Sequence, residues 1–195
     1  MNKQVNKGKI KIGFIGAGYM GYGMALNLLN KYDLTVFAHK NRKPIDDLVQ
    51  KGAKEATDLE ELASLSNVII MCVTNTPVAV DIISEIAPHL QKKTMIIDIT
   101  THKADGSIQI FQKLNSLDIM YVESPVMGGP VQAEEGVLGA IVGCEEKDFE
   151  FAKEILMNFC KDVFYFGPVG MGAKAKLVNN FLSLGTATFV IETLK

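Results

Sequence analysis

The sequence predicts an α/β protein with a doubly wound, Rossmann-type, mainly parallel sheet that is followed by one long helix. The first observation is an apolar strand pattern at 10–15 that runs into a glycine motif and then directly into a helical pattern. The second is the alternation of short apolar runs with amphipathic helical runs, which is typical of a parallel sheet covered by helices. The third is a continuous helical pattern over residues 171–195.

Composition narrows the class of function. The chain has 195 residues, of which 48% are hydrophobic and 22% charged, as in an ordinary globular protein. A formal net charge of −2 gives no electrostatic case for nucleic acid or a membrane surface as partner, so we expect a small molecule. Neither a membrane span nor a signal peptide is visible, which predicts a cytoplasmic location, or an organelle matrix if a presequence has been removed. The three cysteines lie far apart among apolar neighbours, which predicts reduced core residues and no metal site.

The glycine motif follows the strand at 10–15 and opens the first helix. A first glycine allows a tight turn, a second lets a pyrophosphate approach the backbone, and a third lets helix and strand pack closely. The N–H groups of the helix's first turn then face the phosphates. The alternative is a purely structural turn. We predict a dinucleotide site that contains Gly16, Ala17, Gly18, Tyr19, Met20 and Gly21.

The end of the second strand, at 34–37, predicts which cofactor binds. An NAD site usually places an acid about 20 residues past the glycine motif, to bind the ribose 2′-OH. No carboxylate appears here before Asp46. Basic groups cluster instead, and they would form charge-assisted bonds to a 2′-phosphate. The alternative is a solvated basic loop. We predict NADP rather than NAD, held by His39, Lys40, Asn41 and Arg42, with Lys43 nearby.

The middle of the chain keeps alternating. A short helix at 45–51 ends at Gly52, and Asp58 with Glu61 forms a capping box for a helix through Leu65. The run VIIMCV at 68–73 is continuously apolar, as in a strand buried on both faces. Thr76-Pro77 predicts a helix start with threonine as the cap, and the apolar stripe of this helix is Val78, Ile82, Ile83 and Ile86.

The later elements follow from the same periodicities. We predict strands at 95–99, 119–122, 138–142 and 163–166, and helices at 108–117 and 146–159. Ligands of such sheets bind at the carboxyl ends of the strands. The polar or glycine-rich residues there are therefore site candidates, and they include Val73, Thr74, Asn75, Thr101, Met127, Gly128 and Gly129. The Gly128-Gly129 backbone could hold a carboxylate, or it could form an ordinary turn.

The long helix at 171–195 carries a polar stripe in which Lys176 and Asn180 lie one turn apart. One interpretation is a solvated face, which is the usual place of a lysine. The other is a pair that points into a cleft, where the ammonium exchanges a proton with a substrate hydroxyl and the amide orients it.

Four motifs together resemble the β-hydroxyacid dehydrogenase family, which includes 3-hydroxyisobutyrate dehydrogenases and tartronate, glyoxylate or succinic semialdehyde reductases. They are the glycine loop with GYGMALNLL after it, DITT at 98–101, SPVMGG at 124–129 and GMGAKAKLVNN at 170–180. The resemblance implies that Lys176 is the catalytic acid/base, that Asn180 positions the substrate, and that Thr101, Gly128 and Gly129 help to bind it.

The sequence departs from the family at three places. Thr100-Thr101 replaces the usual Ser-Thr, and Met127 replaces a serine before the two glycines, which removes one hydrogen bond to the substrate. Family members continue into a second, all-helical domain, whereas this sequence ends at Lys195. We therefore expect a flexible tail at 1–9, a dinucleotide-binding domain at 10–168, and a long interdomain-type helix at 169–195 after which the second domain is absent.

The implied function is reversible hydride transfer between NADP and a small β-hydroxy acid or semialdehyde, without a metal. Lys176 argues against imine reduction, because a carbonyl reductase needs this proton donor. The alternative is an NADP-binding module without turnover of its own. Because the long helix carries more apolar surface than a sheet needs for cover, we also expect the chain to self-associate through it.

Overall fold

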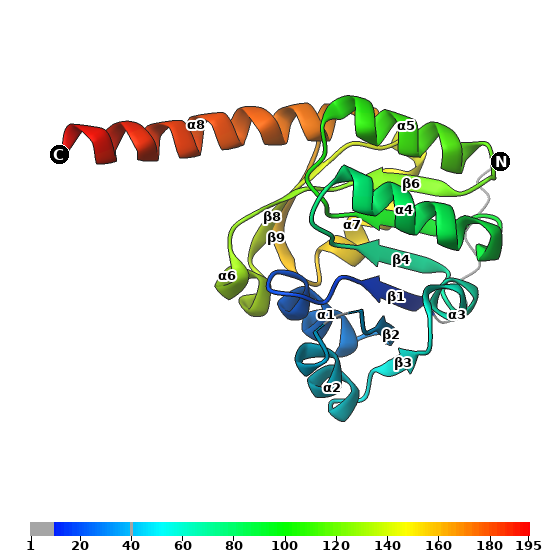
Figure 1. Cartoon of the computed structure of the whole chain (residues 1–195). Helices are drawn as coiled ribbons and strands as arrows, with labels where there is room; N and C mark the ends of the chain where they lie inside the picture. Colours follow the sequence, from blue (N-terminus) through cyan, green and yellow to red (C-terminus); the bar gives the residue numbers. More distant parts are fainter. Residues whose placement is uncertain (1–9, 40) are drawn as a thin grey trace.

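A computed structural model describes residues 10–39 and 41–195 (Figure 1). The tail expected at 1–9 and the expected cofactor contact of Lys40 lie outside these residues. The described chain forms an α/β body from which one long helix projects. The predicted fold class is therefore confirmed.

A six-stranded sheet lies at the centre of the body. Its order is β3-β2-β1-β4-β5-β6, and every pair of neighbours is parallel. The strand order reverses between β1 and β4, and doubly wound folds bind ligands at the carboxyl ends of the strands on either side of such a point. The strands are β1 (Lys11–Ile15), β2 (Asp33–Phe37), β3 (Lys54–Ala56), β4 (Val68–Met71), β5 (Met95–Asp98) and β6 (Met120–Glu123).

Two apolar clusters cover the two faces of this sheet, because successive strand residues point in opposite directions. Phe14 and Ile70 belong to one cluster, while their neighbours Ile15 and Ile69 belong to the other. The first cluster also takes side chains from α1 (Gly21–Leu29), α2 (Lys43–Gln50), α6 (Pro130–Glu135) and α7 (Glu146–Leu156). The second takes them from α3 (Leu59–Leu65), α4 (Thr76–Ile86) and α5 (Ala104–Asn115); a short 3₁₀ helix, Ala87–His89, follows α4.

A second, smaller sheet contains β7 (Val126–Met127), β8 (Leu138–Val142) and β9 (Cys160–Tyr165). β8 pairs parallel with β9 and antiparallel with β7. An isolated bridge between Glu123 and Gly143 links the end of β6 to the end of β8. The strands predicted at 138–142 and 163–166 are present, but the sequence pattern did not show that they belong to a separate sheet.

Two local predictions about α4 are wrong. The cap is Asn75, whose Oδ1 accepts the Val78 N–H at 3.1 Å, and not Thr76, which lies inside the helix. Val78 is 38% exposed, so the buried stripe of α4 begins at Ala79 and continues through Ile83 and Ile86. The capping box at α3 is closer to the prediction: Asp58 accepts the Glu61 N–H, but Glu61 itself accepts the Thr57 N–H.

The cysteines are free thiols, as predicted; Cys144 and Cys160 are buried and Cys72 is partly buried. Burial raises the pKa of each thiol to about 12, so none is a ready nucleophile.

Within residues 10–39 and 41–195, no helix has the length and apolar character needed to cross a membrane. The same residues contain no group of three or more His, Cys, Asp or Glu side chains that could hold a metal ion.

The last helix, α8 (Met171–Thr193), projects from the body (Figure 1). A buried carboxylate at the end of β6 binds its first turn. Glu123 Oε1 accepts N–H bonds from Gly170 at 2.6 Å, Gly172 at 2.8 Å and Ala173 at 3.2 Å. These are N–H groups that a helix cannot satisfy internally, and a negative charge is favourable at this end of the helix dipole. A Cβ on Gly143 or Gly172 would lie within 3.1 Å of Glu123 Oε1, so glycine is needed at both positions.

We expect Glu123→Ala to lower the free energy of unfolding by about 1–3 kcal/mol or more, because it leaves buried donors without an acceptor. Glu123→Gln keeps an oxygen acceptor and is the matched comparison. Burial raises the pKa of Glu123 more than the three N–H bonds lower it, so its contribution to stability is present below the ordinary glutamate pKa and is lost as the pH rises through the raised value. The Gln variant should therefore gain stability relative to the unchanged protein as the pH rises. Urea unfolding of all three proteins between pH 4.5 and 8 checks both expectations. An unchanged alanine variant would contradict the capping role.

Candidate functional site

The glycine motif forms the predicted turn between β1 and α1. Gly16 has a φ of +93°, and a Cβ added to it would lie 2.1 Å from the Cys72 carbonyl oxygen. A Cβ on Gly21 would lie 2.1 Å from the Gly16 carbonyl oxygen, so this glycine allows the helix to approach the strand. The first and third glycines are thus required by the packing, as the motif predicts.

The outer side of the turn is open. A Cβ on Gly18 would meet no atom within 4 Å, and the side chain of Tyr19 is 86% exposed. α1 has no side-chain cap, so part of its N-terminal N–H set is left to a ligand or water. An uncapped helix N-terminus beside an open glycine backbone fits a pyrophosphate group. Met20 at the cap position is half-buried, and Ala17 is buried in the core.

The carboxyl ends of β2 and β3 border a cavity of about 260 Å³. Its lining includes Ala38, at the position where an NAD site would place an acid, and Arg42. His39 and Asn41 are exposed beside it, and Asn41 Oδ1 accepts the Lys43 N–H at 3.3 Å. The Arg42 guanidinium is occupied by two carboxylates, Glu55 and Asp46, which the sequence pattern did not indicate.

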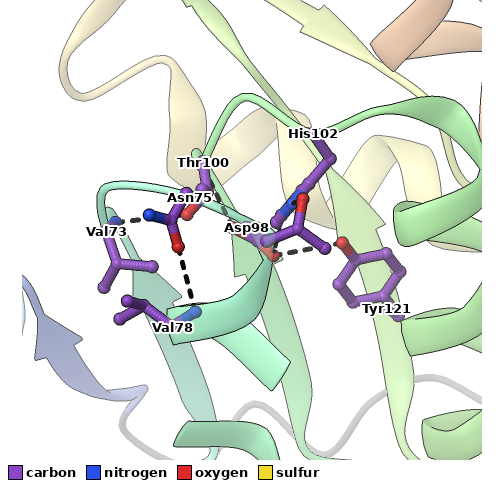
Figure 2. Close-up of polar contacts among 8 residues, drawn as sticks. Val73, Asn75, Val78, Asp98, Thr100, His102 and Tyr121 are labelled. Carbon is purple, nitrogen blue, oxygen red and sulfur yellow. Dashed lines mark hydrogen bonds and ion pairs between the residues drawn. The ribbon is translucent and has the colours of Figure 1, made fainter. Parts of the chain in front are cut away.

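The ends of β4 and β5 are joined by a buried hydrogen-bond network, which Figure 2 shows. Asp98 is fully buried; its Oδ1 accepts the Thr100 N–H at 3.0 Å, and its Oδ2 contacts His102 Nε2 at 2.8 Å and the Tyr121 hydroxyl at 3.1 Å. His102 Nδ1 lies 2.9 Å from the Thr76 hydroxyl. The buried carboxylate is therefore paired by three donors, as a charge in the core must be. Burial, reinforced by Asp98, raises the pKa of Tyr121 well above its usual value.

Sequence reasoning missed the role of His102, which connects β5 to the start of α4. The signal was available in part: an aspartate ends an apolar strand, and a histidine follows four residues later. Two adjacent threonines next to this network have different environments. Thr100 is buried and its hydroxyl accepts the Val73 N–H at 3.1 Å, while Thr101 is exposed. This bond fixes the backbone at Val73, and the two residues that follow it, Thr74 and Asn75, are exposed.

The loop after β6 places its glycines beside β8. Gly128 has a φ of +118°, a conformation that favours glycine. The Gly129 N–H donates to Gln132 Oε1 at 2.9 Å, so a substrate carboxylate would compete with this side chain for it. Met127 is half-buried over β8, where a Cβ on Gly139 would lie 2.8 Å from Met127 Cε.

Lys176 is half-buried on α8, and its Nζ donates to the Val126 carbonyl oxygen at 2.8 Å. Desolvation by this burial lowers the pKa of Lys176 from its usual value. The lysine is therefore not a freely solvated side chain. Asn180 follows one turn later and is half-buried, while the next residue, Phe181, is 76% exposed.

The structure thus joins some predicted site residues by direct contact and leaves others apart. Lys176 meets the segment that contains Met127 and Gly128, and Val73 meets Thr100. Arg42 contacts carboxylates of α2 and β3. The glycine turn follows β1, between the ends of β2 and β4, so these groups share the carboxyl edge of the parallel sheet.

Comparison with known proteins identifies similar chains. Residues 11–167 match the family model for the NAD binding domain of 6-phosphogluconate dehydrogenase. The 2-(hydroxymethyl)glutarate dehydrogenase of Eubacterium barkeri is 32% identical over 177 residues, which cover 89% of this chain and 58% of that protein. The mitochondrial 3-hydroxyisobutyrate dehydrogenase of Drosophila melanogaster is also 32% identical, over 90% of this chain and 54% of its own length.

A solved structure, that of Psf3 in complex with NADP⁺ and 2-OPP, superimposes with a TM-score of 0.84 and 26% identity. It is covered to 66% by this chain, 93% of which takes part in the match. The chain therefore spans less than two thirds of the length of each of these three proteins.

Proposed function

The chain belongs to the β-hydroxyacid dehydrogenase family, whose N-terminal part it matches, and we propose that it provides the NADP-binding and proton-transfer residues of a hydroxy acid dehydrogenase or semialdehyde reductase. The observation that carries the proposal is the Lys176 ammonium, which is half-buried, bound to the Val126 carbonyl and lowered in pKa. A solvated surface lysine would show none of these three properties.

The cofactor would be held by the open backbone at Gly18 and the uncapped start of α1, with its adenosine end toward Ala38 and Arg42. When bound, a nicotinamide dinucleotide supplies the hydride donor or acceptor. Two features support NADP over NAD: no acid stands at Ala38, and a guanidinium lines the cavity. The similar chain of Psf3 is named as a complex with NADP⁺.

Lys176 would act as the general acid/base that exchanges a proton with the substrate oxygen. Its ammonium has three N–H groups, one of which is bound by the Val126 carbonyl oxygen, so two can face a substrate oxygen. In the reducing direction Lys176 donates a proton to the carbonyl oxygen of a small semialdehyde; in the oxidising direction its neutral amine accepts the proton of the hydroxyl group. A lowered pKa brings these two states closer together near neutral pH.

The remaining polar groups would orient the substrate. Asn180 follows Lys176 by one turn of α8, and Thr101 extends an exposed hydroxyl at the end of β5. Gly128 and Gly129 present backbone in the loop that the lysine touches, where Met127 adds an apolar contact. We propose a small hydroxy acid or semialdehyde as the partner. A cytoplasmic location stays a prediction from the sequence.

A second candidate is an NADP-binding module that performs no turnover of its own. The exposed side chains of α8 next to Asn180 favour it, because a reaction of this kind needs walls that exclude water from the substrate. Titration of the protein with NADPH and NADH, followed by a screen of small semialdehydes for oxidation of the bound cofactor, distinguishes the two candidates.

Arg42→Ala should remove most of a preference for NADPH over NADH, because it deletes the guanidinium that lines the cavity at the ends of β2 and β3. We expect the dissociation constant of NADPH to rise about tenfold or more, while that of NADH stays nearly constant. Fluorescence titration of both cofactors measures this effect. Lys92→Ala removes an exposed cation that does not line this cavity and is the control for net charge. Equal affinity of the unchanged protein for the two cofactors would contradict the prediction.

Lys176→Ala should lower turnover roughly 100-fold or more and leave cofactor affinity nearly unchanged, as expected for the loss of a general acid/base. Lys174→Ala, an exposed lysine on the same helix, is the control. Because reduction needs the protonated amine, its rate should fall as the pH rises through the lowered pKa of Lys176, and the rate of oxidation should rise. Steady-state rates between pH 6 and 10 in both directions measure this. Near-normal turnover of the Lys176→Ala variant would contradict the acid/base role of this lysine.

We also propose that a second copy of the chain covers the apolar side chains of α8. The exposed set on α8 and its C-cap residue includes Leu177, Val178, Phe181, Leu182, Leu184, Phe189, Val190, Ile191 and Leu194. An apolar surface of this kind is unfavourable in water and promotes association. Phe181→Glu with Phe189→Glu should shift the mass in sedimentation equilibrium to that of a single chain. Lys161→Glu alters charge on β9 and should leave the assembly unchanged. A single-chain mass for the unaltered protein would refute this proposal.

A further inference from the structure

The Arg42 guanidinium lines the cavity at the ends of β2 and β3, and it is hydrogen-bonded to two carboxylates. Arg42 Nη1 lies 3.0 Å from Glu55 Oε1, and Nη2 lies 3.1 Å from Glu55 Oε2, so the two groups form a bidentate ion pair. Asp46, one turn along α2, accepts a further bond from Nη2 at 3.0 Å. These bonds raise the pKa of Arg42, with those to Glu55 as the largest cause.

Glu55 reaches this position from the neighbouring strand. β3 pairs parallel with β2, and Glu55 lies beside Val36 in the register. Its side chain is 32% exposed, and it lines the same cavity of about 260 Å³ as Ala38 and Arg42. The cavity that would receive the adenosine ribose therefore contains a carboxylate as well as a cation.

We propose that Glu55 sets the cofactor preference of this chain by competing with the 2′-phosphate of NADP for Arg42. The fork geometry of a guanidinium matches a carboxylate and a phosphate equally well, so a phosphate that binds the Nη1–Nη2 edge of Arg42 must displace Glu55 from it. A dianionic phosphate placed in this cavity would also be repelled by the Glu55 charge. The inference rests on the proposed function, because it requires the adenosine end of the cofactor to bind here.

The competition tunes affinity and does not block binding. Arg42 is 58% exposed, and an ion pair at this exposure is weak and is screened by salt. Removal of the Glu55 charge should therefore strengthen NADPH binding by about fivefold at low salt, the upper end for an exposed pair, and by less at high salt. NADH lacks the phosphate, so its affinity should not change.

The experiment measures dissociation constants of NADPH and NADH by fluorescence titration at low and high salt, with 2′,5′-ADP and 5′-ADP as probes of the adenosine end alone. Glu55→Gln keeps the shape of the side chain and should bind NADPH and 2′,5′-ADP about fivefold more tightly. Relative to Arg42→Ala alone, Arg42→Ala combined with Glu55→Gln should show a clearly smaller gain, because no guanidinium remains to be released and only the repulsion between Glu55 and the phosphate is removed. Glu85→Gln removes an exposed carboxylate of α4 and controls for net charge.

Each outcome separates this inference from the proposed function. An unchanged NADPH affinity in Glu55→Gln, with Arg42→Ala still losing affinity, would overturn the role of Glu55 alone. Weaker NADH binding in Glu55→Gln would also overturn it, and would identify Glu55 as the acid that binds the ribose hydroxyls of NAD. If Glu85→Gln gained as much NADPH affinity as Glu55→Gln, the effect would come from net charge, and the proposed role of Glu55 would be overturned. Failure of the unchanged protein to bind either cofactor would overturn the proposed function together with this inference.

Discussion

The contact between the Glu123 carboxylate and the first turn of α8 determines where the candidate acid/base can lie. Three backbone N–H groups at the start of the helix converge on one buried oxygen at the end of β6. Gly143 and Gly172 leave the space that this oxygen needs. With the helix start held in this way, Lys176 falls on the side that faces the Val126 carbonyl, only three residues beyond Glu123 in the chain. The same short segment thus holds both the helix and the lysine.

Features that depend on local sequence could be predicted. The glycine turn, the alternation of strands and helices and the long terminal helix follow from periodicity and from the conformations that glycine permits. The separate sheet of β7, β8 and β9 could not be predicted, because an apolar strand pattern does not say which strand it pairs with. Thr76 and Asn75 are both good capping residues, and the choice between them depends on His102, which bonds the threonine hydroxyl from another loop.

The candidate site shows the same limit. Lys176 could be selected because a family motif surrounds it, but its half-buried state and its bond to Val126 depend on packing between distant segments. The basic cluster after β2 was visible in the sequence, whereas the occupation of Arg42 by Glu55 was not, since the acid is thirteen residues away on another strand. A run of basic residues can be recognised in the sequence, but the acidic residues that pair with it are brought close only when the chain folds.

The attachment of α8 at one end has a mechanical consequence. A helix rises about 1.5 Å per residue, so Lys176 lies roughly 7 Å from the start of α8 and Thr193 roughly 33 Å from it. If the helix swings by about 5° around its Glu123 anchor, the far end moves by about 3 Å and the lysine by well under 1 Å. Proton transfer is sensitive to displacements near 1 Å. A lever that is anchored next to its reactive group can therefore accommodate whatever docks along its outer length while the ammonium stays in place.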